Sequence, residues 1–162
     1  MYERTEELLW EAGYHRYEIS NYAREGKECR HNLGYWSRVE YLGIGLGASS
    51  FISNTRYHLC TDMISYIERI GSGEDLREEI EVLTKEDAME EFMFLGLRLT
   101  GGVRTAEFER RFGVAMEAVY GEVIERLLKE GLLEASVQTD SHIRLTEYGL
   151  DVSTYALAEF LQ

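Results

Sequence analysis

From residue 84 onward, apolar side chains recur every three or four positions, which is the period of an amphipathic helix. The clearest run is 116–128, and Gly131 then ends this helix. Thr84 and Asp87 match the pattern of a capping box at the start of the first helix. The segment predicts, in chain order, helices over 84–99, 105–112 and 116–131, a two-stranded ribbon over 132–137 and 142–145, and a helix capped by Thr146. This order is typical of a winged helix-turn-helix module.

The first part of the chain has shorter patterns. Residues 2–12 predict a helix, and the alternation of apolar and polar residues at 14–19 predicts a strand. The pattern then predicts a short helix over 32–38, a hairpin of 50–52 and 56–59, and a helix over 63–70 that ends in a flexible joint at 71–73. A single strand at 14–19 would leave backbone groups unpaired on both edges, so we expect its neighbours in a longer parent. The open edge near Tyr17 would also favour a homodimer through strand addition.

Composition indicates a folded protein without a membrane span. The 162 residues are 44% hydrophobic, yet no run approaches the ~20 apolar residues needed to cross a bilayer. The first residues lack the features of a secretion signal, so we expect a cytoplasmic protein without membrane insertion. Cys29 and Cys60 have no nearby Cys or His repeat and are expected to be free thiols, since Cys29 with His31 would supply too few ligands for a metal.

The formal net charge of −13 is unevenly distributed along the chain. Residues 1–60 carry 7 Lys/Arg against 8 Asp/Glu, whereas residues 61–162 carry 10 against 22 and therefore hold −12 of the −13. A surface of that sign repels nucleic acid phosphates and anionic lipid headgroups. We expect neither nucleic acid nor a membrane surface to be a direct partner.

The helix expected at 116–131 would be the recognition helix of a DNA-binding winged helix, but its charges argue against that role. Its charged residues are Glu117, Glu122, Glu125 and Glu130 against Arg126 and Lys129. Recognition helices ordinarily present Arg, Lys, Asn or Gln to base edges. Arg110 and Arg111 form the local basic pair, for which a solvated helix end is the simplest interpretation. The module is therefore expected to pack against the rest of the protein or to dock a partner.

Three stretches of the first part resemble the late part of the oxygen-independent coproporphyrinogen III oxidase-like radical SAM family. They read Tyr-Glu-Ile-Ser-Asn-Tyr-Ala at 17–23, Arg-His-Asn-Leu-Gly-Tyr-Trp at 30–36 and Tyr-Leu-Gly-Ile-Gly-Leu-Gly-Ala at 41–48. The similarity continues through Leu-Gly-Leu-Arg at 95–98 to Leu-Thr at 145–146, so it covers nearly the whole chain. The resemblance implies that the chain is the carboxyl-terminal part of such a protein.

The second stretch contains the His-Asn-x-x-Tyr-Trp signature associated with the haem-chaperone branch of that family, here His31, Asn32, Tyr35 and Trp36. The resemblance implies that these residues contact haem, with His31 on the haem iron and Tyr35 and Trp36 as flat packing surfaces. An imidazole nitrogen is a good axial ligand, and aromatic faces suit an apolar macrocycle. In a helix, His31 and Tyr35 would share a face, with Trp36 about 100° further round. Capping and core packing by the same residues stay open as the simpler alternative.

The chain departs from the family pattern in two places. The glycine-rich turn often reads Gly-Pro-Gly-Ala-His-Ser in the family, whereas residues 45–50 read Gly-Leu-Gly-Ala-Ser-Ser, so no role of that histidine carries over. Here the glycines at 43, 45 and 47 predict close backbone approach or unusual dihedral angles. The chain also lacks the Cys-x-x-x-Cys-x-x-Cys loop that holds a [4Fe-4S] cluster for S-adenosylmethionine. We expect both cofactors only in a full-length parent, and the chain alone to be inactive in that chemistry.

The sequence thus predicts an α+β chain in two parts. Residues 1–60 are expected to be the end of a radical SAM α/β barrel with the haem motif and a β-hairpin, and residues 61–162 a helical, winged-helix-like C-terminal domain. The leading functional prediction is part of a haem chaperone that binds haem around His31 and delivers it to a client protein, including a membrane-associated one. The alternatives are a fragment of a decarboxylating coproporphyrinogen III oxidase of porphyrin biosynthesis and a non-catalytic winged-helix DNA-binding regulator.

Overall fold

A computed structural model describes residues 2–136 and 141–161, and its mixture of helices and strands confirms the predicted α+β class. The chain divides into two compact units, one made of Met1–Arg38 with Met89–Gln162 and the other of Val39–Ala88. The expected boundary between residues 60 and 61 concerns the domains of a longer parent and stays a prediction. Within the described ranges, no helix has the length and apolar character needed to cross a bilayer.

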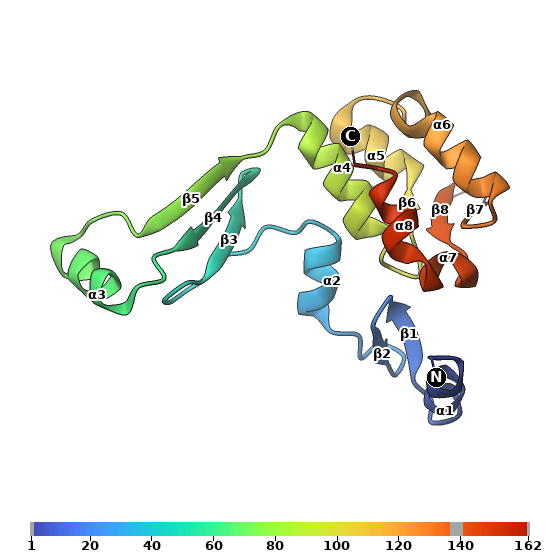
Figure 1. The fold of residues 1–162 in the computed structure, drawn as a ribbon, viewed down its shortest axis with the longest axis horizontal. Coiled ribbons are helices and arrows are strands. Elements are labelled where there is room, and N and C mark those ends of the chain that lie inside the picture. Colours follow the sequence, from blue (N-terminus) through green and yellow to red (C-terminus); the bar gives the residue numbers. More distant parts are fainter. Residues whose placement is uncertain (1, 137–140, 162) are drawn as a thin grey trace. The chain divides into compact units, whose positions relative to one another are not determined.

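The unit Val39–Ala88 is built on a three-stranded antiparallel sheet with a helix at one end of it (Figure 1). Ser53 and Asn54 form the two-residue turn of the predicted hairpin, at the positive φ of 49° and 58° that type I′ turns require. The sequence pattern did not predict the third strand, whose apolar residues Ile80 and Val82 are exposed. Backbone pairing with the neighbouring strand defines it. In sheet order the strands are β3 (Ser49–Ile52), β4 (Thr55–Leu59) and β5 (Arg77–Val82), and the helix is α3 (Met63–Ser72).

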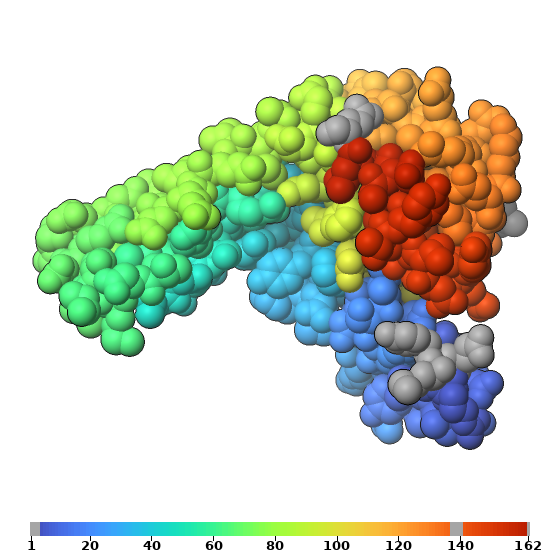
Figure 2. All heavy atoms as spheres, viewed as in Figure 1, coloured from blue at the N-terminus to red at the C-terminus, as the bar shows by residue number. Residues whose placement is uncertain are grey.

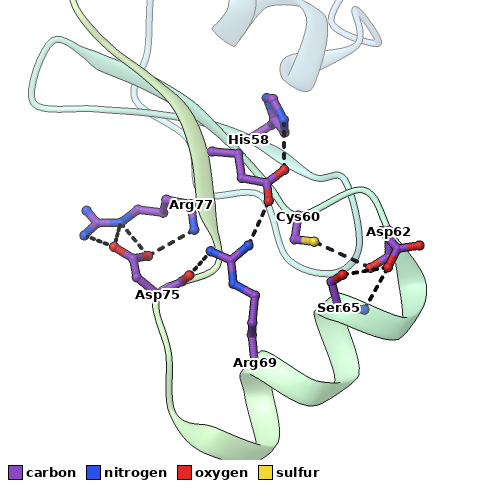
Figure 3. A network of polar contacts seen from close by, with 8 residues as sticks. His58, Cys60, Asp62, Ser65, Arg69, Asp75 and Arg77 are labelled. Carbon is purple, nitrogen blue, oxygen red and sulfur yellow. Dashed lines mark hydrogen bonds and ion pairs between the residues drawn. The ribbon is translucent and has the colours of Figure 1, made fainter.

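A polar network fixes α3 to this sheet (Figure 3). Asp62 accepts hydrogen bonds from the backbone N and the Oγ of Ser65 at 2.8 and 2.7 Å, which lower the pKa of the Asp62 carboxyl. Arg69 contacts Glu78 of β5 at 2.7 Å. The apolar side of α3 is more than half exposed in the described structure, at Met63, Ile64, Ile67 and Ile70. The predicted helix is therefore confirmed, but polar contacts rather than burial of its apolar stripe hold it.

Glycines mark the sharp bends of this unit. A Cβ on Gly43 would lie 2.2 Å from the backbone oxygen of Ser49, and Gly47 has a φ of 67°. The predicted close approach and unusual dihedral angles are thus confirmed. The joint expected at 71–73 is shorter than predicted, because Gly71 and Ser72 are helical and Gly73 alone ends α3 at a φ of 74°.

The elements after residue 84 follow the predicted order. Asp87 Oδ2 accepts from Thr84 N at 2.7 Å and Thr84 Oγ1 accepts from Asp87 N at 3.1 Å, which confirms the capping box. Thr146 caps the last predicted helix by accepting a hydrogen bond from the N–H of Gly149. That helix is interrupted at Val152 and forms two short helices. Residue 137 of the predicted ribbon and residues 138–140 between its two strands lie outside the described residues. The elements are α4 (Lys85–Gly96), β6 (Val103–Arg104), α5 (Thr105–Phe112), α6 (Met116–Lys129), β7 (Leu133–Ser136), β8 (His142–Leu145), α7 (Glu147–Asp151) and α8 (Ser153–Ala158).

These elements share one apolar core. Phe108, Tyr120 and Phe160 are buried, and ring contacts join Tyr120 to the two phenylalanines at 6.0 and 5.5 Å. In Figure 2 the atoms of α6, in orange, lie against those of α7 and α8, in red. The two-residue strand β6 adds to the predicted ribbon and gives a sheet of order β6-β8-β7. The helices and strands follow the predicted order, and the winged-helix assignment of this module stays a prediction.

The expectation of a lone strand near Tyr17 is wrong. The first unit begins with α1 (Tyr2–Glu11), and β1 (His15–Glu18) pairs antiparallel with β2 (Asn21–Ala23), which the pattern missed because it is only three residues long. On the other side, Ile19 N donates to the carbonyl of Arg98 at 3.1 Å and Thr100 N donates to that of Tyr17 at 3.2 Å. The edge near Tyr17 is therefore occupied, and the expectation of a homodimer through this edge loses its basis.

Candidate functional site

The signature residues lie on one short helix, α2 (Arg30–Trp36). The helix was expected over 32–38 but begins two residues earlier, so that His31 and Asn32 belong to its first turn. At its other end, Ser37 N donates to the carbonyl of Leu33 at 3.0 Å. No residue of α2 is fully buried, and its sequence offers no side-chain cap at Cys29. Contacts outside the helix must therefore hold it in place, because so short a helix is unstable alone.

His31 and Tyr35 share an exposed face of α2, as predicted. Their ring centroids are 4.5 Å apart and their planes meet at 76°, an edge-to-face contact. Both side chains are exposed. The arrangement offers an imidazole beside an aromatic surface, which can ligate a metal ion and pack against a flat apolar ligand.

Asn32 and Trp36 turn toward the body of the same unit. Asn32 Nδ2 donates to the hydroxyl of Tyr17 at 3.4 Å. The Arg98 guanidinium lies over the Trp36 ring, 4.3 Å from its centroid, which is a close cation–π contact. The four signature residues thus share one helix but not one surface, since His31 and Tyr35 are exposed whereas Asn32 and Trp36 are partly buried.

Arg98 links Trp36 to a buried carboxylate, that of Glu18 at the end of β1. Glu18 is 0% exposed, and its Oε1 accepts from Ser20 N at 2.9 Å and from Asn21 Nδ2 at 2.5 Å. Its Oε2 lies 3.8 Å from an Arg98 nitrogen, which is an ion pair without a short hydrogen bond. These hydrogen bonds fix the turn of residues 19–20 that joins β1 to β2.

Within the part of the chain that the structure describes, three buried side-chain atoms without a hydrogen-bond partner lie here: Glu18 Oε2, Arg98 Nε and Trp36 Nε1. Buried polar atoms without partners are uncommon and mark places where a water, a ligand or another segment completes the bonding. The sequence did not predict the role of Arg98, which appeared only as the last residue of the Leu-Gly-Leu-Arg stretch that the chain shares with the family. A possible signal was a charged residue, Arg98, directly after an apolar stretch that contains Leu95 and Leu97.

The described residues do not fit an iron-sulfur cluster. Cys29 is exposed and Cys60 is buried, and both are free thiols, as predicted. Across residues 2–136 and 141–161, no three His, Cys, Asp or Glu side chains gather as metal ligands would. Since a [4Fe-4S] cluster needs three cysteines or more, two separate thiols cannot hold one.

The candidate DNA-reading helix has both of its cations engaged. Lys129 Nζ contacts Glu125 at 2.7 Å, and Arg126 forms an ion pair with Glu159. Cations that bind DNA must be available to phosphates or bases. The paired charges of α6 support the expectation of no nucleic acid partner, which stays a prediction.

Comparisons with known proteins agree with the resemblance. Residues 83–152 match the family model described as the HemN C-terminal domain. Heme chaperone HemW of Lactococcus lactis is 37% identical over 161 residues, covering 99% of this chain and 41% of the relative. Heme chaperone HemW of Bacillus subtilis is also 37% identical, covering 99% of this chain and 42% of the relative. The chain belongs to the coproporphyrinogen III oxidase-like radical SAM family, in its haem-chaperone branch.

A solved structure of the same family shows the shared fold. Coproporphyrinogen III oxidase (HemN) from Escherichia coli, described as a radical SAM enzyme, matches 98% of this chain with a TM-score of 0.75 at 17% identity. The match covers 39% of that chain, and the present chain spans about two fifths of the curated relatives it matches. At this identity the match supports the architecture and not the activity.

Proposed function

We propose that this chain is the haem-carrying part of a haem chaperone, which binds haem on the exposed face of α2 and passes it to a client protein. The observation that carries the proposal is the pairing of His31 with Tyr35 on one exposed face, within an intact signature. The relatives from Lactococcus lactis and Bacillus subtilis, both named heme chaperones, support the same class of function. His31 would ligate the iron, and Tyr35 would pack beside the macrocycle.

An exposed ligand suits delivery better than storage. A resident haem is usually enclosed by an apolar pocket, whereas a carrier must release its haem to another protein. A site on a helix surface leaves one side of the macrocycle accessible, so a client can bind before the His31–iron bond breaks. The C-terminal part of the same unit, residues 89–162, carries 13 Asp/Glu against 7 Lys/Arg and would dock that client.

The cluster chemistry of the family belongs, in this proposal, to a longer parent. The chain offers two separate cysteines, so its part in haem carriage would not pass through a [4Fe-4S] cluster or S-adenosylmethionine. We expect the 162-residue chain to bind haem without assembling a cluster. Stable incorporation of one cluster per chain during iron-sulfur reconstitution would contradict this.

A haemin titration followed by Soret absorbance tests the proposal. His31→Ala is expected to weaken binding at least tenfold, because it removes the iron ligand. His15→Ala is the matched control, since His15 is also exposed and also meets an aromatic ring edge-on, Trp10 at 4.3 Å. Its effect should stay below twofold. Equal affinity for haemin in the wild type and in His31→Ala would overturn the proposed function.

A further inference from the structure

A pocket of about 180 Å³ lies beside the last residue of α2, in the same unit. It is bounded by the end of α2, one side of α4, β6 and one side of α5. Two of its walls are aromatic, and its charged groups are mainly guanidinium. The residues that matter for its chemistry are Trp36, Arg38, Phe92, Arg104, Glu107 and Arg111.

The charge of this pocket is opposite to that of the chain. Three arginines and one glutamate line it, although the chain carries a net charge of −13. The glutamate is already engaged, because Glu107 contacts Arg110 at 2.6 Å and Arg111 at 2.5 Å. Arg38 is paired with Glu91 at 2.9 Å. A positive pocket on an acidic protein selects a ligand that carries negative charge.

Arg111 has the geometry of an anion anchor. Its Nε donates to Glu107, its Nη1 donates to the carbonyl of Ser37 at 3.4 Å, and its guanidinium lies 5.5 Å from the centroid of the Phe92 ring. These contacts orient the group before any ligand arrives. Its Nη2 makes no hydrogen bond with a described residue, so it can donate to a carboxylate. A hydrogen bond from a guanidinium to a carboxylate is charge-assisted and therefore stronger than one between neutral groups.

We propose that this arginine pocket binds carboxylate groups, and that these are the propionates of the haem carried on α2. The assignment rests on the proposed function. The pocket is smaller than the ~300 Å³ at which sites begin to enclose a whole drug-sized ligand, so it accepts a side chain of the porphyrin and not the macrocycle. His31 and Trp36 are five residues apart, about 7.5 Å along the helix axis. That separation is comparable with the reach of a propionate from the haem iron.

Arg111→Gln, with Arg110→Gln as its matched control, tests the pocket. Both arginines belong to α5 and both contact Glu107, but only Arg111 lines the pocket. Haemin and haemin dimethyl ester, which lacks free carboxylates, are titrated against the wild type and both variants. We expect Arg111→Gln to weaken haemin binding about fivefold to tenfold and Arg110→Gln less than twofold. Binding of the ester should be the same in all three proteins.

Equal loss for haemin and the ester in Arg111→Gln, or equal loss of haemin in the two variants, would overturn the assignment. If Arg111→Gln fails to fold by circular dichroism, Arg111→Lys decides the question, because it keeps the charge and should still weaken haemin but not the ester. Sodium benzoate separates the two sources of a carboxylate. Saturable benzoate binding that leaves haemin affinity unchanged would identify a separate small-carboxylate site and contradict the propionate assignment.

The same titrations distinguish a failure of the pocket assignment from a failure of the proposed function. If His31→Ala weakens haemin binding and Arg111→Gln does not, the pocket assignment fails and haem carriage on α2 stands. If His31→Ala has no effect, the proposed function fails, and so does the assignment of haem propionates that rests on it.

Discussion

His31 and Trp36 belong to one signature on one helix, yet they meet opposite surroundings. His31 is exposed and contacts Tyr35, whereas Trp36 is partly buried beneath Arg98 and is connected through it to the fully buried Glu18. A shared signature therefore does not imply a shared contact with the ligand. In this interpretation the exposed residues bind haem, and the buried ones hold the helix that presents them.

Truncation of Trp36 should give the largest difference in stability between the buried and the exposed residues of the signature. Trp36→Ala is expected to lower the free energy of unfolding by about 3 kcal/mol, the low end for a truncated aromatic, because the ring is partly exposed. Urea denaturation followed by circular dichroism measures the change. His31→Ala is the control on the same helix and should stay within about 0.5 kcal/mol, as an exposed substitution does. A loss below about 1 kcal/mol for Trp36→Ala would show that this ring does not anchor α2.

The buried carboxylate should give the next largest effect. Glu18→Ala removes the acceptor of Ser20 N and Asn21 Nδ2 and leaves the Arg98 charge without its partner, so we expect a loss of about 2 kcal/mol. Glu18→Gln keeps an acceptor oxygen and loses only the ion pair, which should cost about 1 kcal/mol. Thermal unfolding of both variants distinguishes these values. Equal losses in the two would mean that the carboxylate charge does not matter.

A smaller, pH-dependent effect is expected at Glu107, which lines the pocket beside the C-terminal end of α2. Hydrogen bonds from Arg110 and then Arg111 lower the pKa of this carboxyl from 4.5 to about 2. Because the pKa is lower in the folded chain, ionised Glu107 stabilises the fold above pH 4.5, and this stabilisation is lost as the pH falls toward 2. The stability gap between the wild type and Glu107→Gln should be below about 1 kcal/mol at pH 7, as for a surface ion pair. Melting curves should show it closing between pH 4.5 and 2, and a gap independent of pH would contradict this.

Sequence periodicity predicted the long helices and the haem face, because those features are local. The apolar spacing of α6 and the capping pair Thr84 and Asp87 specify structure within one turn or one helix. The shared face of His31 and Tyr35 follows from their spacing of four residues. These predictions need no knowledge of the rest of the fold.

Sequence patterns missed the features that depend on partners far along the chain. The strand β5 is largely charged and forms by pairing with β4, and Tyr17 meets Thr100 across more than eighty residues of sequence. The stacking of Arg98 on Trp36 and the pocket around Arg111 arise in the same way. Such contacts come from the folded arrangement and leave no periodic signal.

The central claim is that His31 holds haem iron from an exposed face of α2. Resonance Raman spectroscopy of the ferrous haem complex tests it most directly, because it detects the stretching vibration of an iron–histidine bond. The band should be present in the wild type and in His15→Ala, absent in His31→Ala, and restored in His31→Ala by added imidazole. An unchanged iron–histidine band in His31→Ala would contradict the account.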